Sequence, residues 1–353
     1  MTTPAVLAVH ADWSVAPRKR WMTVAARAGS AWRMTAPEPV GEPASLFARL
    51  LDRAGGAPVA FGGDFPLGLP RAYADRAGIA RFPDWLGCLD PEAPLFTPCD
   101  RLAEVSLARP FFPRARASGA GLMAALADAL GLDDAAALRR DVDWPTARRP
   151  GAAPLFWTLG ANQCGKGGLS AWRETMIPAI RAGVPLAIWP FDGDLRALLA
   201  AGRIVVAETY PREAMVGLDL RLAGSKRRQA DRRGICTALR AAMARLGVHA
   251  SADLAAVAAD GFGARADGED RFDSVLGALG VIRVVDGAAD GAPGDAAIRS
   301  VEGWVLGQTD PPIRPPVRPA SRKAAASPPP SRPRRPRQDP RSRPAGQPRS
   351  GSG

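Results

Sequence analysis

Three carboxylates in this chain stand at the ends of apolar runs that are typical of buried strands. Asp12 ends the first run, Asp64 follows a second, and Glu208 ends a third. If these strands are parallel neighbours, their carboxyl ends share one edge of a sheet in which adjacent strands lie about 4.8 Å apart. Ligands of open α/β sheets bind at that edge. We therefore expect the three acids to belong to one site.

Two further acids, Asp270 and Asp273, stand near the start of the last amphipathic segment. Their i, i+3 spacing places both on one face of a helix. The same stripe continues through Gly277 and Gly280, whose small size would let the helix lie close to the sheet. We expect the start of this helix to direct both aspartates toward the same edge.

Together these acids predict a site for a divalent cation. Crowded carboxylates repel one another, and burial increases the cost, so a cation normally accompanies them. Oxygen ligands suit Mg²⁺ or Mn²⁺, and two such ions about 3.5–4 Å apart can activate water and stabilise the leaving oxygen in phosphodiester cleavage. We predict that the metal ligands, which are also the catalytic residues, are Asp12, Asp64, Asp270 and Asp273, and that Glu208 assists catalysis.

Each acid also has a purely structural interpretation. Asp64 could form a turn, Asp270 could cap a helix, and Asp273 could complement a helix dipole. The chain has only two histidines, which makes a histidine-rich zinc site or a Ser-His-Asp triad hard to build. His10 alternates with Asp12 on the first predicted strand, and we expect it to be an ordinary strand histidine.

Basic side chains near the predicted site could contact phosphates. Residues 224–233, "GSKRRQADRR", carry five cations and are expected to begin a basic helix, with Lys226 and Arg227 as substrate contacts. Arg212 could clamp a phosphate or pair with Glu208. Such cations make nucleic-acid binding fall with salt, although a solvated helix face is the alternative interpretation.

Residues 160–166 match the G-x-x-x-x-G-K pattern of a phosphate-binding loop. A nucleotide-binding loop needs Ser or Thr next, but Gly167 follows. Three alternatives stay open: a nucleotide loop, a plain structural loop, and a flexible loop near the acidic edge. In the last case the substrate contacts would be Asn162, Gln163 and Lys166.

The predicted elements that position these residues follow an α/β order. Three strands, a helix and a fourth strand are expected within residues 1–70, and a further strand and the last helices within residues 201–309. These two segments would form one discontinuous domain. Residues 71–200 are rich in Pro, Trp and Phe and are interpreted as an inserted cap.

Composition favours a cytoplasmic protein without membrane segments. Of its 353 residues 46% are hydrophobic, but no apolar run reaches about 18 residues and no basic flank marks a signal peptide. The four cysteines are widely scattered, as expected for free thiols in a reducing compartment.

The formal charge of +12 is concentrated in residues 310–353, which hold eleven Arg and Lys residues and two Asp residues, leaving +3 for the other 309 residues. This Pro/Arg-rich tail is expected to be disordered. It could follow phosphate backbones, or it could be only a solvated tail, so the charge alone does not identify a nucleic-acid partner.

Several stretches taken together resemble a bacterial domain-of-unknown-function family of predicted RNase H-like nucleases. They include "ADWS", "DFPLGLP", "FWTLGANQCGKGG", "IWPFDGD", "AETYPREA", "GSKRRQADR", "EDRFDSVLGALGVI" and "VEGWVLG", and they span residues 10–307. The resemblance implies an RNase H-like mixed five-stranded sheet flanked by helices, with a large, mostly helical and irregular insertion. It also implies a RuvC-like arrangement of acids, with Asp12, Asp64 and the pair Asp270/Asp273 in the places of metal ligands.

We therefore predict a Mg²⁺- or Mn²⁺-dependent nuclease that hydrolyses phosphodiester bonds in DNA or RNA. Two alternatives stay open. One is a non-catalytic protein of the same fold that binds nucleic acid or a nucleotide. The other is a nucleotide-dependent phosphotransferase that uses residues 160–166.

Overall fold

One mixed sheet runs through the computed structural model, which describes residues 6–114, 121–159, 164–289 and 291–315. The strands are β1 (Leu7–Asp12), β2 (Trp21–Ala28), β3 (Ala31–Met34), β4 (Glu38–Pro39), β5 (Val59–Gly63), β6 (Leu186–Ile188), β7 (Ile204–Glu208) and β8 (Val248–Ala250). Their order is β6-β7-β5-β1-β2-β3-β8, and β4 pairs with β2. β1, β5, β7 and β6 are mutually parallel, whereas β2 is antiparallel to both β1 and β3.

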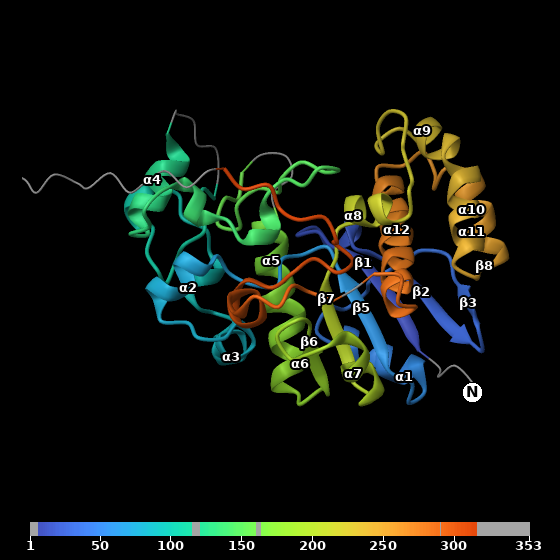
Figure 1. The fold of residues 1–353 in the computed structure, drawn as a ribbon, viewed down its shortest axis with the longest axis horizontal. Coiled ribbons are helices and arrows are strands. Elements are labelled where there is room, and N and C mark those ends of the chain that lie inside the picture. The colour runs from blue at the N-terminus through green and yellow to red at the C-terminus, as the bar shows by residue number, and fades with distance from the viewer. Residues whose placement is uncertain (1–5, 115–120, 160–163, 290, 316–353) are drawn as a thin grey trace, which may run out of the picture. The chain divides into compact units, whose positions relative to one another are not determined.

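Helices cover both faces of this sheet (Figure 1). They are α1 (Leu46–Ala54), α2 (Arg71–Ala77), α3 (Phe82–Cys88), α4 (Leu122–Ala129), α5 (Gly165–Ala171), α6 (Ile177–Arg181), α7 (Leu195–Ala200), α8 (Pro211–Gly217), α9 (Gln229–Gly234), α10 (Cys236–Arg245), α11 (Ala252–Ala259) and α12 (Gly268–Val285). A π-helical turn, Trp172–Met176, joins α5 to α6. None of the helices in the described ranges has the length and apolar character that crossing a membrane requires.

Local sequence signals explain where several helices begin and end. The side chain of Asp194 accepts hydrogen bonds from two backbone N–H groups at the start of α7, and Ser251 accepts one from Leu254 N at the start of α11. Such caps satisfy N–H groups that have no partner within the helix. Gly55 ends α1 in the left-handed conformation, with φ of 57°.

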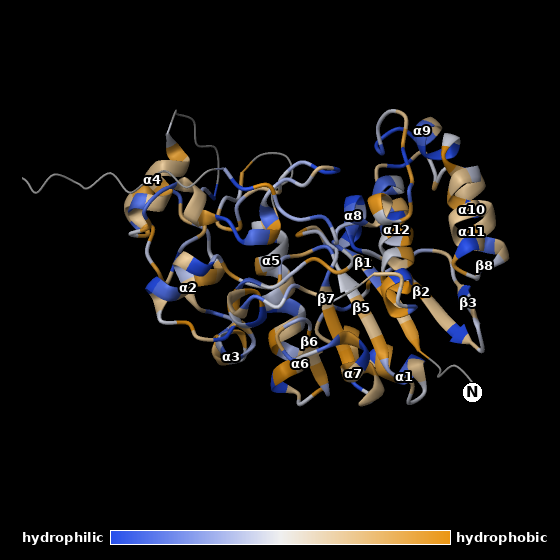
Figure 2. Cartoon of the chain, in the orientation of Figure 1, coloured by the Kyte–Doolittle hydropathy of each residue, from blue (hydrophilic) through white to orange (hydrophobic). Residues whose placement is uncertain are grey.

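The two faces of the sheet bury different cores because side chains alternate along each strand. On β1, Leu7 and Val9 point into a core shared with α1 and the insertion. Ala8 belongs to the opposite core, which contains α12, and His10 contacts α12 at Gly277. In Figure 2 the apolar colour follows the central strands, whereas α9 is mostly hydrophilic.

The predicted number of strands is wrong. The sheet has eight strands rather than five, because β4, β6 and β8 add to it. β6 and β8 are only three residues long, too short to show a clear pattern in the sequence. β6 also lies within residues 71–200, so the segment outside the sheet ends before residue 186.

The predicted basic helix is also different from expectation. Residues 225–228 form a turn, and two separate helices, α9 and α10, follow it. Lys226 and Arg227 therefore lie on a loop rather than on a helix face. Of the predicted disordered tail, only residues 310–315 lie within the described ranges, and they have no regular secondary structure. The four cysteines are free thiols, as the sequence predicts.

Candidate functional site

Asp12 and Asp64 lie side by side at the carboxyl ends of two parallel strands. β1 pairs with β5 up to Ala11 and Gly63, and Asp64 N donates to Ala11 O at 3.3 Å. Trp13 N donates to Asp64 Oδ1. By alternation along the strands, both carboxylates belong to the face that α12 covers. Asp12 and Asp64 therefore lie next to each other at one edge of the sheet, as the sequence predicts.

The start of α12 adds Asp273 and Asp270 to this edge. α12 packs along β1 and β2 (Figure 1), and its buried Gly277 allows the approach, since a Cβ there would lie 2.2 Å from the His10 ring. Asp273 Oδ2 accepts a hydrogen bond from Lys226 Nζ. Asp273 Oδ1 and Asp270 Oδ2 are buried and have no hydrogen-bond partner in the described part of the chain.

The electrostatics of these four acids show that they share one environment. Burial, followed by the charges of Asp64, Asp273 and Asp270, raises the pKa of Asp12 well above its ordinary value. Burial raises the pKa of Asp64 to about 8 despite the opposing hydrogen bond from Trp13 N. Burial also raises the pKa of Asp270 to about 6, and that of Asp273 increases as well. The cluster therefore favours bound protons or a bound cation.

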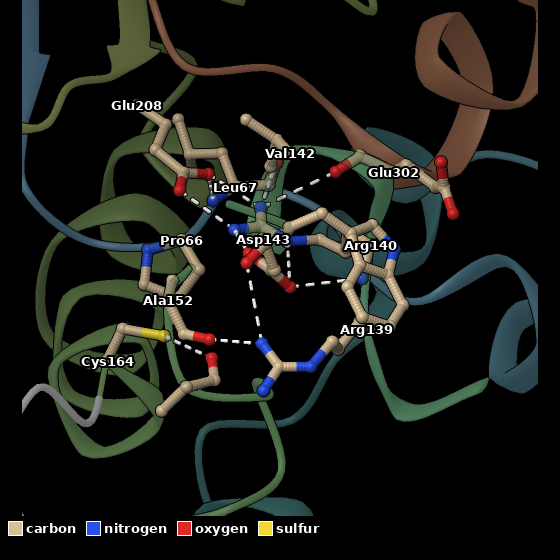
Figure 3. Close-up of polar contacts among 12 residues, drawn as sticks. Pro66, Leu67, Arg139, Arg140, Val142, Asp143, Ala152, Cys164, Glu208 and Glu302 are labelled. Atoms are coloured by element: carbon tan, nitrogen blue, oxygen red, sulfur yellow. Dashed lines mark hydrogen bonds and ion pairs between the residues drawn. The ribbon is translucent and has the colours of Figure 1, made fainter. Parts of the chain in front are cut away.

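Glu208 lies at the same edge but on the other face of the sheet. It pairs in register with Gly63, one residue before Asp64, so its side chain points away from α12. Arg140 donates to both of its carboxylate oxygens, at 2.6 and 2.8 Å, and Leu67 N donates to Oε2 at 2.8 Å (Figure 3). The structure gives Glu208 a complete set of buried partners, and none of them is one of the four aspartates.

The predicted pairing of Arg212 with Glu208 is absent, because Arg140 takes both carboxylate oxygens of Glu208. Arg140 also binds Asp143 at 2.9 Å, so one buried arginine joins two acids (Figure 3). Arg212 is exposed on the first turn of α8 instead. Because Arg140 comes from the insertion, this network fixes the insertion to the end of β7.

Thr209 is a site residue that the sequence reasoning missed. It follows Glu208, so alternation returns it to the α12 face, where its Cγ2 would lie 2.5 Å from a Cβ placed on Gly62. The Thr209 hydroxyl is buried without a hydrogen-bond partner among the described residues, and Thr209 lines the cleft beside the acids. The sequence could have indicated Thr209, because side chains alternate along a strand and the residue beside Asp64 on the same face is residue 209 rather than residue 208.

A cleft of about 1340 Å³ opens over this edge. Asp64, Thr209 and Asp273 lie in its lining, and so does Glu208 together with its partner Arg140. Basic side chains also line it, namely Lys19, Arg140, Arg148, Arg149, Lys166, Arg212, Arg221 and Lys226. Three of the predicted substrate contacts, Lys166, Arg212 and Lys226, are thus brought to one cleft with the acids.

The remaining predicted substrate contacts do not join them. The side chain of Arg227 is 83% exposed and lies 3.8 Å from Glu269, and Arg227 is not part of the cleft lining. Asn162 and Gln163 lie outside the described residues. His10 packs under Gly277, and its burial lowers its pKa to about 3, so it is neutral at physiological pH.

Packing explains Gly165 and Gly168, whereas a Cβ on Gly167 would meet nothing within 4 Å. A Cβ on Gly165 would lie 2.3 Å from Leu155 O, and one on Gly168 would lie 2.7 Å from the ring of Pro66. Lys166 Nζ donates to Arg114 O at 3.3 Å. Gly165, Lys166 and Gly168 belong to α5, and residues 160–163 lie outside the described ranges, so nothing in the described residues adds support for a nucleotide loop.

The donor set of the cluster fits a hard divalent cation. Its donors are carboxylate oxygens and a hydroxyl, which Mg²⁺ and Mn²⁺ prefer, and two of the buried carboxylate oxygens have no partner among the described residues. In the described ranges, however, no three His, Cys, Asp or Glu side chains are already arranged around one point as metal ligands. A cation would therefore draw the aspartates together.

No protein-family model, curated protein or solved structure matches this chain. The function must therefore be inferred from the fold and from the site itself.

Proposed function

We propose that this chain is a Mg²⁺- or Mn²⁺-dependent nuclease of RNase H-like fold. The observation that carries the proposal is the convergence of Asp12, Asp64, Asp270 and Asp273 on one face of one sheet edge, where Asp64 and Asp273 line a cleft that basic side chains also line. Acids that raise one another's pKa values need a cation to be charged together. The basic lining suits the phosphates of a substrate.

The topology supports the RNase H-like part of the proposal. Three antiparallel strands, β1 to β3, and the two-residue β4 precede α1, and β5 then adds to β1 in the parallel sense. β7 extends the sheet beyond β5, and α12 brings the late pair of aspartates. This order of elements and this placement of acids support the RNase H-like part of the proposal.

The chain's own residues would divide the work as follows. Asp12, Asp64, Asp270 and Asp273 hold the divalent ion, which supplies Lewis-acid stabilisation of charge on the phosphate. Arg212 and Arg221 line the cleft and are placed to bind neighbouring phosphates. Glu208 keeps the insertion in place through Arg140 and does not bind the ion.

The test is cleavage of labelled single strands, duplexes, RNA–DNA hybrids and four-way junctions, with Mn²⁺ or with EDTA. Asp12→Asn should reduce cleavage by about 10³-fold or more, since it removes a charge at the reacting centre. Asp128→Asn, an exposed change on α4, is the matched control and should retain full activity. Cleavage that survives Asp12→Asn or EDTA would indicate a contaminating nuclease.

Binding without cleavage would favour the alternative of a non-catalytic nucleic-acid-binding protein. If the folded protein binds Mn²⁺ and nucleic acid but cleaves none of the substrates, the site is a binding site. If it binds neither, the acidic-site interpretation is wrong.

A further inference from the structure

The acidic cluster contains a cation of its own, the ammonium group of Lys226. Its Nζ donates to Asp273 Oδ2, and the side chains of Lys226 and Asp273 are 30% and 10% exposed. Lys226 is therefore a charged member of the cluster and not a side chain on its rim.

The loop that carries Lys226 is fixed on one side by Asp231. The Asp231 carboxylate accepts hydrogen bonds from Ser225 N at 2.8 Å and from Arg228 Nε at 2.6 Å. Gly224 adopts a φ of +111°, and a Cβ there would lie 2.2 Å from the same carboxylate. The turn before Lys226 is thus held in one conformation.

A buried arginine fixes the same loop on the other side. Arg232 is 1% exposed, and it donates to the backbone oxygen of Lys226. It also donates to Gly261 O at 2.9 Å and to Gly263 O at 2.7 Å. These contacts tie Lys226 to the segment that leads into α12. The same segment therefore helps to position both the Lys226 ammonium and Asp273.

The second oxygen of Asp273 accepts no hydrogen bond from Lys226 or from any other described residue. Asp273 Oδ1 and the hydroxyl of Thr209 are buried and have no hydrogen-bond partner among the described residues. Asp273 and Thr209, taken as whole residues, are 7% and 5% exposed, and both line the cleft. In a two-ion site the ions lie about 3.5–4 Å apart and share a carboxylate-rich shell, but here Lys226 holds one oxygen of that shell.

We propose that Lys226 takes the place of one of two divalent ions, so that the four aspartates bind a single Mg²⁺ or Mn²⁺. This inference rests on the proposed function, because it assumes that the aspartates bind a metal. Lys226 then neutralises Asp273 before the metal binds and remains beside it afterwards. The class of catalyst is a one-ion nuclease with a lysine in the cluster.

The experiment counts Mn²⁺ ions per chain by titration calorimetry and by electron paramagnetic resonance of free Mn²⁺. The full chain should bind one ion. Lys226→Met, which keeps the length of the side chain but removes its charge, should bind two. Arg233→Met removes a charge from a side chain that is 56% exposed and paired with Asp260, and it should bind one ion like the unchanged protein.

The outcomes separate this inference from the proposed function. Two ions on the unchanged protein, or one ion with unchanged affinity on Lys226→Met, would overturn the proposed role of Lys226. Neither result would overturn the proposed metal-dependent nuclease. No Mn²⁺ on either protein would overturn the metal site and the inference with it. If Lys226→Met does not fold by circular dichroism, Lys226→Gln tests the same point, because it also removes the charge and should bind two ions; one ion with unchanged affinity would contradict the proposal.

Discussion

At the scale of single residues, protons and metal compete for the same carboxylates. Burial raises the pKa of Asp64 from an ordinary value of 3.8 to about 8. Between these values the folded, metal-free protein holds a proton on Asp64 that the unfolded chain has released. Asp12, Asp270 and Asp273 shift in the same direction.

Because the unfolded state binds fewer protons in this window, the free energy of unfolding in EDTA should decrease as the pH rises from about 4 to about 8. Asp64→Asn, which cannot ionise, should reduce the slope without abolishing it, since the other three aspartates remain. Urea unfolding at a series of pH values measures both slopes. A wild-type stability that rises with pH, or an unchanged slope in Asp64→Asn, would contradict the assignment.

The same shifts predict how the metal binds. Mn²⁺ requires deprotonated carboxylates, so binding should release protons and become tighter as the pH rises toward about 8. Titration calorimetry in two buffers with different ionisation enthalpies measures the number of protons released. Binding whose heat is independent of the buffer near neutral pH would show that the aspartates are already ionised without metal.

At the scale of elements, the contact between α12 and β1 sets the position of Asp270 and Asp273. A Cβ on Gly277 would lie 2.2 Å from the buried His10 ring. Gly277→Ala should therefore destabilise the protein by about 1–3 kcal/mol through overpacking. It should also weaken Mn²⁺ binding, because the start of α12 must shift. Denaturant unfolding and Mn²⁺ titration test the two effects.

Gly234 provides the matched control for this substitution. It also lies in a helix, but a Cβ there meets nothing within 4 Å. Gly234→Ala should be neutral, or stabilising by up to about 1 kcal/mol, because it lowers the entropy of the unfolded chain. Equal effects at both positions would mean that His10 yields to the added methyl group and that the contact does not position α12.

The sequence predicts an element when the pattern of residues within that element is enough to indicate it, and fails when the element depends on contacts with distant segments. The D-x-x-D spacing and the glycine stripe predicted the helix of Asp270 and Asp273, and the apolar runs predicted β1, β5 and β7. β6 and β8 were missed because three-residue strands depend on pairing with a neighbour rather than on pattern. The partner of Glu208 was missed because Arg140 is 68 residues away in the chain.

At the scale of the whole molecule, a buried ion network joins the insertion to the sheet. The side chain of Arg140 is 1% exposed and pairs with Glu208 and Asp143. Arg140→Met should cost about 3–5 kcal/mol of unfolding free energy, since it leaves two buried acids without their cation. Chemical denaturation measures the loss, and a loss below about 1 kcal/mol would show that water compensates the acids.

Arg148 supplies the control for Arg140. Its side chain is 50% exposed and pairs with Asp310 at 2.7 Å. Exposed pairs contribute little, so Arg148→Met should cost less than about 1 kcal/mol. The unfolding free energy lost in Glu208→Gln should lie between the losses in Arg140→Met and Arg148→Met, because Arg140 keeps Asp143 as a partner.

The position of Glu208 on the far face of the sheet also has an evolutionary consequence. Asp64 and Glu208 stand at neighbouring strand ends, yet Glu208 pairs with Arg140, whereas Asp64 is proposed to bind the metal ion. In diverging relatives, positions 140 and 208 should therefore change together, whereas position 64 should follow Asp12 and the α12 pair. The residue at the end of β7 would thus vary together with the insertion, and the residue after β5 would vary together with the proposed metal ligands.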